Sequence, residues 1–133
     1  MAPDRVQLAV SGLGLLLVAL ACGWTVWAVR TTGLRRILGR PSPPPALVLR
    51  GPYRFVRHPC CSGVLLFLLG TWLWCPGWIA AGGFVVGLGA CLAWVAFHDR
   101  RRVARFGEAY RRYREAVPAL VPGRSKRWRE ASR

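Results

Sequence analysis

The feature that most constrains this chain of 133 residues is a long stretch without charge, from Pro59 to Phe97. A bilayer core of ~30 Å is crossed by about 20 helical residues, so the stretch has room for two crossings. A Pro-Gly pair at 76–77 lies inside it and is a strong turn signal. The stretch therefore predicts a helical hairpin whose spans lie at about 60–75 and 78–97.

A second uncharged apolar run, at about 6–29, is also long enough to cross a bilayer. The apolar region of a signal peptide is usually shorter, at ~7–15 residues. The mean hydropathy of the whole chain is +0.28, which is high for a domain of this size. We therefore expect residues 1–133 to form one all-α domain, an integral membrane helical bundle of about three transmembrane helices.

The net charge of +15 is carried by arginine-rich segments at the ends of these runs. Arginines flank membranes on the cytoplasmic side, so a loop at 30–58 and a tail at 98–133 are predicted to be cytoplasmic in this multi-pass protein. Basic charge also occurs in nucleic-acid-binding proteins, but the long uncharged runs favour a membrane, and no nucleic-acid reader motif is present. The five cysteines follow no zinc-ligand spacing, so no metal is expected.

The tail from His98 to Val117 is predicted to be one amphipathic helix, because its apolar residues recur at spacings of three and four. Pro118 would end it. Such a helix could lie on the lipid headgroups or close over a membrane-embedded site. Prolines at 41 and 43–45 in the loop predict extended polyproline geometry.

The segment with the most chemical content runs from Leu47 to Gly63, with the sequence LVLRGPYRFVRHPCCSG. It gathers an aromatic ring, guanidinium groups and an imidazole beside Pro59, which suits the first turn of a helix. A helix N-terminus favours an anionic group. The segment therefore suits a charged cofactor bound at the membrane surface, although tyrosine and arginine also serve as plain interfacial anchors.

Two motifs, GPYRFVRHP at 51–59 and FGEAYRRY at 106–113, are followed by Val117-Pro118 and together resemble the isoprenylcysteine carboxyl methyltransferase family. The phospholipid methyltransferases are relatives of that family. The resemblance covers Leu47 to Pro122. It implies a membrane enzyme that uses S-adenosyl-L-methionine to methylate a lipophilic substrate, with the cofactor entering from the cytoplasm.

The resemblance also implies which residues touch the cofactor. A tyrosine ring can face the sulfonium cation, while arginines and the first N–H groups of a helix can hold a carboxylate. The residues expected to bind S-adenosyl-L-methionine are Tyr53, Arg57, His58, Pro59, Cys60, Cys61 and His98.

The chain departs from the family pattern at several positions. Cys61 replaces a tyrosine, His98 and Asp99 replace paired glutamates, and Trp94 replaces a substrate-side arginine. Asp99 and Arg100 are the candidate catalytic residues that could substitute. A plainer interpretation makes Asp99 a helix cap, or the partner of Arg102 or Arg105 in a salt bridge.

These observations predict a methyltransferase most like the enzymes of isoprenylcysteine carboxyl O-methylation. Two alternatives stay open: a phospholipid amine N-methyltransferase, and a degenerate member of the family that binds lipid or a partner protein without catalysis. The expected partners are a lipophilic or prenylated substrate and membrane lipids, with no nucleic acid. Because three spans leave little room for a lipid pocket, a homo-oligomer or a partner subunit is also compatible with the sequence.

Overall fold

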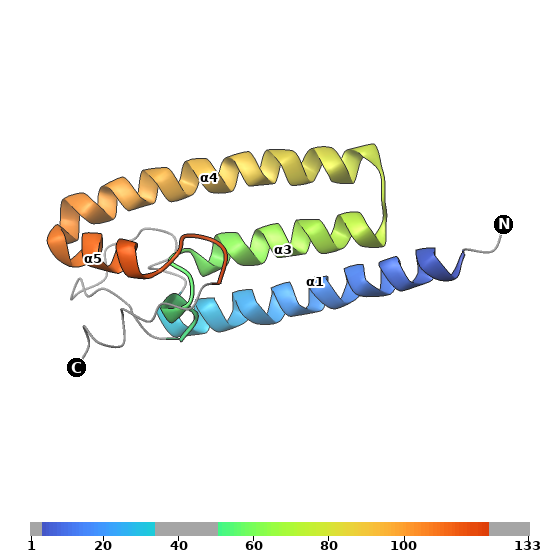
Figure 1. The fold of residues 1–133 in the computed structure, drawn as a ribbon, viewed down its shortest axis with the longest axis horizontal. Coiled ribbons are helices and arrows are strands. Elements are labelled where there is room, and N and C mark those ends of the chain that lie inside the picture. The colour runs from blue at the N-terminus through green and yellow to red at the C-terminus, as the bar shows by residue number, and fades with distance from the viewer. Residues whose placement is uncertain (1–3, 34–50, 123–133) are drawn as a thin grey trace.

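The computed structural model of the protein describes residues 4–33 and 51–122, and the regular structure within these ranges is all helical. Figure 1 shows three helices running along the long axis of the molecule, with a short turn and a short helix gathered at one end. The elements are α1 (Arg5–Thr32), η1 (Gly51–Arg54), α3 (Pro59–Trp74), α4 (Trp78–Phe106) and α5 (Glu108–Ala116). This is the all-α bundle that the sequence predicts.

Two of the helices, α1 and α4, are long and apolar enough to cross a membrane, with mean hydropathies of 2.1 and 2.0. Helix α3 is apolar too, but its 16 residues reach about 24 Å at 1.5 Å per residue, which is less than the ~30 Å of a bilayer core. It begins at Pro59, in the first helical position that suits proline. Which side of a membrane each end faces stays a prediction.

Small residues hold α1 against α3. The buried residues of α1 are Gly14, Ala21 and Ala28, seven apart, and the buried residues of α3 include Gly63 and Gly70. A Cβ added to Gly70 would lie 2.7 Å from the Gly14 carbonyl oxygen. The two backbones therefore approach closely, as small residues allow in lipid.

The glycines of α4 behave differently. Gly87 of α4 faces the Leu68 side chain of α3, whereas a Cβ on Gly83 would meet nothing within 4 Å. At Gly87, α4 therefore meets a side chain of α3 and not its backbone. The closest helix contact lies in the α1–α3 pair.

The prediction of one continuous helix from His98 to Val117 is wrong, because two helices cover this range. Helix α4 runs on through Asp99 to Phe106, and Gly107 then breaks the chain at φ +56° before α5 begins. Glycine adopts this backbone conformation without strain. The predicted apolar stripe survives the break, because Tyr110, Tyr113 and Val117 pack as one buried cluster with residues of α4. The proline-rich part of the predicted loop lies outside the described residues.

Candidate functional site

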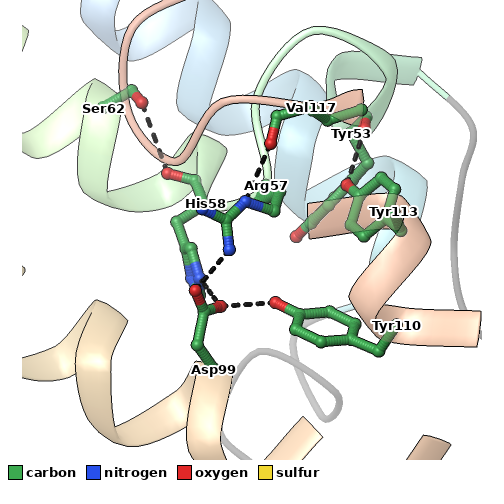
Figure 2. A network of polar contacts seen from close by, with 8 residues as sticks. All are labelled: Tyr53, Arg57, His58, Ser62, Asp99, Tyr110, Tyr113 and Val117. Atoms are coloured by element: carbon green, nitrogen blue, oxygen red, sulfur yellow. Dashed lines mark hydrogen bonds and ion pairs between the residues drawn. The ribbon is translucent and has the colours of Figure 1, made fainter. Parts of the chain in front are cut away.

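The two sequence motifs, at 51–59 and 106–113, meet at one end of the bundle. We call this the basic end and define it as residues 51–62 and 98–122. It joins η1, the first turn of α3, the last turns of α4, helix α5 and the segment after α5 (Figures 1 and 2). Both sequence motifs therefore contribute to one small region.

Asp99 is the centre of a buried polar network (Figure 2). Its carboxylate accepts hydrogen bonds from the Arg57 guanidinium and the Tyr110 hydroxyl, and lies 2.8 Å from Nε2 of His58. Asp99 is 8% exposed, and Arg57 and His58 are similarly buried. A buried charge is tolerated when it is paired and hydrogen-bonded in this way. The ion pair of Asp99 is thus with Arg57, and the plainer prediction of a bond to Arg102 or Arg105 is wrong about the partner.

The segment after α5 lies along the residues that precede α3. Arg57 donates from Nε to the carbonyl oxygen of Val117 at 2.8 Å, and its backbone N–H donates to Pro118 at 2.9 Å. Two further bonds continue the pattern, from the His58 N–H to Ala119 and from the Ser62 hydroxyl to Leu120. The chain after α5 is therefore fastened directly over the start of α3.

Two tyrosines of α5 complete the attachment. The Tyr113 hydroxyl donates to the Tyr53 carbonyl oxygen at 2.7 Å, and the Tyr110 hydroxyl donates to Asp99. Burial raises the pKa of the Tyr110 phenol, and its bond to Asp99 raises the pKa further. Burial likewise raises the pKa of Tyr113. Both phenols therefore stay protonated and act as donors around neutral pH.

The first turn of α3 presents backbone N–H groups to this region. The first backbone bond within the turn runs from Ser62 N–H to His58 carbonyl at 3.1 Å, so the N–H groups of Cys60 and Cys61 precede the helical pattern. Such groups give a helix N-terminus its positive character. The Trp24 indole of α1 donates to the Pro59 carbonyl at 3.1 Å and ties α1 to the same turn.

The face of α4 beside the start of α3 carries aromatic and basic groups. The Sγ of Cys91 lies 3.9 Å from the Cys61 carbonyl oxygen, which brings this face against α3. One turn onward, the rings of Trp94 and His98 stack with centroids 4.2 Å apart. The Arg102 guanidinium lies 6.0 Å from the Tyr110 ring centroid.

The predicted site residues are thus placed unequally. Arg57 and His58 both contact Asp99, and Tyr53 joins them through α5. The remaining predicted residues divide into three groups: Pro59, Cys60 and Cys61 start α3; His98 stacks on Trp94; and Arg100 is exposed outside the network. Their binding and catalytic roles stay predictions.

Sequence reasoning missed three contributors to this region: Tyr110, Tyr113 and Arg102. The tyrosines were assigned to an apolar stripe, yet their spacing of three already placed both hydroxyls on one helix face. Arg102 had no signal of its own, because it stands in a run of three arginines.

The bundle also holds an apolar cavity of about 350 Å³ between α1 and α3. It is lined by Ala21, Cys22, Thr25, Val26, Gly63, Val64, Phe67 and Leu68. None of these side chains is charged, so the cavity does not suit a charged cofactor. The charged groups of the buried network lie instead at the basic end.

The fold and the site together define a helical protein with membrane-length helices and a polar, basic region at one end. The family model for phospholipid methyltransferase matches residues 10–101. This is more than half of the chain, and the chain therefore belongs to the phospholipid methyltransferase family. The relationship predicted from the two motifs is confirmed. Comparison with curated proteins and with solved structures returned no match.

Proposed function

We propose that the protein is an S-adenosyl-L-methionine-dependent methyltransferase acting on a lipophilic substrate at the membrane. The observation that carries the proposal is the family match over residues 10–101, which includes most of α1, then η1, α3 and α4 as far as Arg101. Both long apolar helices suit an enzyme that meets its substrate in a bilayer. Membership of the family supports methyl transfer in general terms.

The donor groups at the basic end fit the charges of this cofactor. The N–H groups of Cys60 and Cys61 and the positive end of α3 suit its carboxylate. The cofactor supplies a methyl group on a sulfonium cation, and an aromatic face attracts such a cation. Tyr53 is only 5% exposed, whereas Trp94 is 47% exposed and stacks on His98. We therefore assign the open aromatic face to Trp94.

The buried network has a different part in the proposal. The side chains of Arg57 and His58 are hydrogen-bonded to Asp99, and Arg57 also bonds to the segment after α5. We infer that they are positioning residues, which fix the start of α3 and help to keep the region dry. Methyl transfer gains chiefly from such positioning and from exclusion of water.

Two acceptor classes follow from the two lines of support. The GPYRFVRHP motif favours an isoprenylcysteine-type carboxylate, which needs no base to act as a nucleophile. The family description favours a phospholipid amine, which must first lose its proton. A binding role without catalysis is the second candidate function, favoured by the internal use of Asp99 and by Arg100 lying outside the network.

The test is methyl transfer from isotopically labelled S-adenosyl-L-methionine to lipid by the full chain in phosphatidylcholine vesicles. Farnesylcysteine and phosphatidylethanolamine are supplied as separate acceptors, and label in the organic extract is measured. We expect label in one of them, and we expect Trp94→Ala to raise KM for the cofactor about tenfold. Trp78→Ala, at the opposite end of α4 and 95% exposed, is the matched control and should behave as wild type.

Incorporation of label into neither acceptor by folded protein would overturn the catalytic proposal and favour the binding role. Equal effects of Trp94→Ala and Trp78→Ala would overturn the assignment of the aromatic face.

A further inference from the structure

Arg102 is a partly buried cation with no acidic partner in the described structure. It lies on α4 one turn beyond Asp99, so the two side chains share a face of the helix. Within residues 4–33 and 51–122, Arg102 belongs to no ion pair. A guanidinium without an acidic partner can hold an anionic ligand through charge-assisted hydrogen bonds.

The chain can offer few anions of its own. It has five acidic residues against 20 basic ones. Asp99 is occupied by Arg57, His58 and Tyr110, and Glu108 pairs with Arg112 at 3.7 Å. The others are Asp4 at the start of α1, the exposed Glu115, and Glu130 outside the described residues. The anion that would neutralise Arg102 is therefore expected to come from a ligand.

The surroundings of Arg102 show that it faces inward. Its guanidinium lies 6.0 Å from the centre of the Tyr110 ring. Burial raises the pKa of Tyr53, Tyr110 and Tyr113, and the positive charge of Arg102 lowers the pKa of each by a smaller amount. Tyr53 lies in η1 and the other two in α5, so the guanidinium sits among three elements of the basic end.

The neighbouring arginine of α4 provides a contrast at the same depth. Arg101 is exposed, and its guanidinium lies 4.5 Å from the centre of the Phe97 ring on the outer side of the helix. Arg101 and Arg102 differ in height by about 1.5 Å along the helix axis. The two side chains therefore lie at nearly the same depth relative to a membrane but point to different sides of α4.

The depth of Arg102 points to a particular anion. The predicted span ends at Phe97, and Arg102 lies five residues onward, or about 7.5 Å along the helix. The headgroup layer extends roughly 5–8 Å beyond the hydrocarbon core on each side. The guanidinium would thus lie at the level of lipid phosphates, and its planar fork matches a phosphate with two parallel hydrogen bonds.

We propose that Arg102 binds the phosphate of a phospholipid headgroup at the basic end, beside the start of α3. The inference rests on the proposed function and deepens it, because it assigns a residue of this chain to the headgroup of the phospholipid acceptor. An alkyl tail would extend from that phosphate toward the apolar part of the bundle.

The experiment is native mass spectrometry of the detergent-purified full chain titrated with phosphatidylethanolamine. Arg102→Gln should weaken binding about tenfold or more, because it removes charge-assisted hydrogen bonds, while Arg101→Gln should stay within about twofold of wild type. Arg102→Lys keeps the charge but loses the two-pronged geometry, and should give an intermediate loss. The lysine variant keeps the test meaningful if the glutamine variant does not fold.

Two competing ligands separate the sources of the anion. Diacylglycerol, which has the same tails without a phosphate, should bind weakly and equally to wild type and Arg102→Gln. Inorganic phosphate should compete only at far higher concentration. Phosphate alone binding as tightly as the lipid would overturn the assignment to a headgroup, and so would equal losses in Arg101→Gln and Arg102→Gln.

Calorimetry with S-adenosyl-L-methionine on the same samples separates this inference from the proposed function. Wild-type protein that binds the cofactor, together with unchanged lipid binding in both Arg102 variants, would overturn the Arg102 site alone. Lipid binding that depends on Arg102 in protein that binds no cofactor would support the site and overturn the methyltransferase proposal.

Discussion

The apolar part of the bundle and the basic end are held together by different physics. Along α1 and α3, glycines and alanines bring two backbones into contact, and a single side-chain hydrogen bond is described beside Gly14, from the Ser11 hydroxyl to the Trp74 carbonyl oxygen. At the basic end, one carboxylate gathers Arg57 and His58, from the segment before α3, and Tyr110 from α5. The helix contact in the first region requires residues with little or no side chain. The second region requires hydrogen bonds of defined direction to a single residue, Asp99.

The difference shows where each region can be damaged. A close backbone contact is spoiled by adding one methyl group, but the damage stays within that contact. A buried network is spoiled by removing one charge, because the partner charges are then left unpaired in a low-dielectric site. The basic end should therefore be the more sensitive region to single substitutions.

The largest effect is expected for Asp99→Ala. The change leaves the buried Arg57 guanidinium without its carboxylate and removes the acceptor of Tyr110. Breaking a buried pair typically costs about 3–5 kcal/mol of unfolding free energy. Thermal unfolding in detergent, followed by circular dichroism, measures the loss.

A double variant, Arg57→Met with Asp99→Leu, tests the reason for that loss. Replacing both charges by apolar groups removes the unpaired charge, so much of the stability should return. No recovery in the double variant would show that the carboxylate acts through something other than its pairing with Arg57.

The next largest effect is expected for Gly70→Ala in the α1–α3 contact. The new Cβ would lie 2.7 Å from the Gly14 carbonyl oxygen and 2.9 Å from the Val18 nitrogen, so the backbones must separate. Overpacking of this kind costs about 1–3 kcal/mol. Gly83→Ala is the control, since a Cβ there meets nothing within 4 Å, and it should be neutral or stabilising by up to about 1 kcal/mol. Similar unfolding temperatures for the two variants would refute the close contact.

A smaller effect is expected for Tyr113→Phe, which removes the bond from its hydroxyl to the Tyr53 carbonyl and keeps the ring. A neutral hydrogen bond contributes about 0.5–1.5 kcal/mol. The same unfolding assay measures it, and hydrogen exchange in α5 should rise more than exchange in α1. A uniform rise along the chain would argue against a local attachment of α5.

The smallest effect is expected for Glu108→Gln, which removes an exposed ion pair with Arg112 at 3.7 Å. Exposed pairs contribute about 0–1 kcal/mol, and salt screens them. The unfolding temperature should change little, and the change should vanish at high salt. A loss as large as that of Asp99→Ala would overturn the contrast between buried and exposed charge.

Much of the fold could be predicted from the sequence because uncharged runs mark membrane-length helices directly. The runs at 6–29 and 78–97 lie within α1 and α4, and α3 is shifted by one residue from 60–75. The break at Gly107 was missed because the apolar spacing of three and four continues across it, from Phe106 to Tyr110. The spacing of apolar residues predicts which side chains share a face, but it does not predict a bend that leaves this spacing unchanged.

The candidate site was predicted less completely. Arg57, His58 and Asp99 were all selected, but their contact was not, because pairs about 42 residues apart leave no local trace in a single sequence. Arg100 was chosen over Arg102 for the same reason. In a run of arginines, only the packing of α4 against α5 decides which one faces inward.

The most direct test of the account is a calorimetric titration of S-adenosyl-L-methionine into the folded, detergent-purified protein, beside Asp99→Asn and Glu108→Gln. We predict micromolar binding to wild type and to Glu108→Gln, and binding weakened about tenfold or more in Asp99→Asn, whose buried network no longer fixes the start of α3. No binding to folded wild-type protein would contradict the assignment of a methyltransferase site to the basic end.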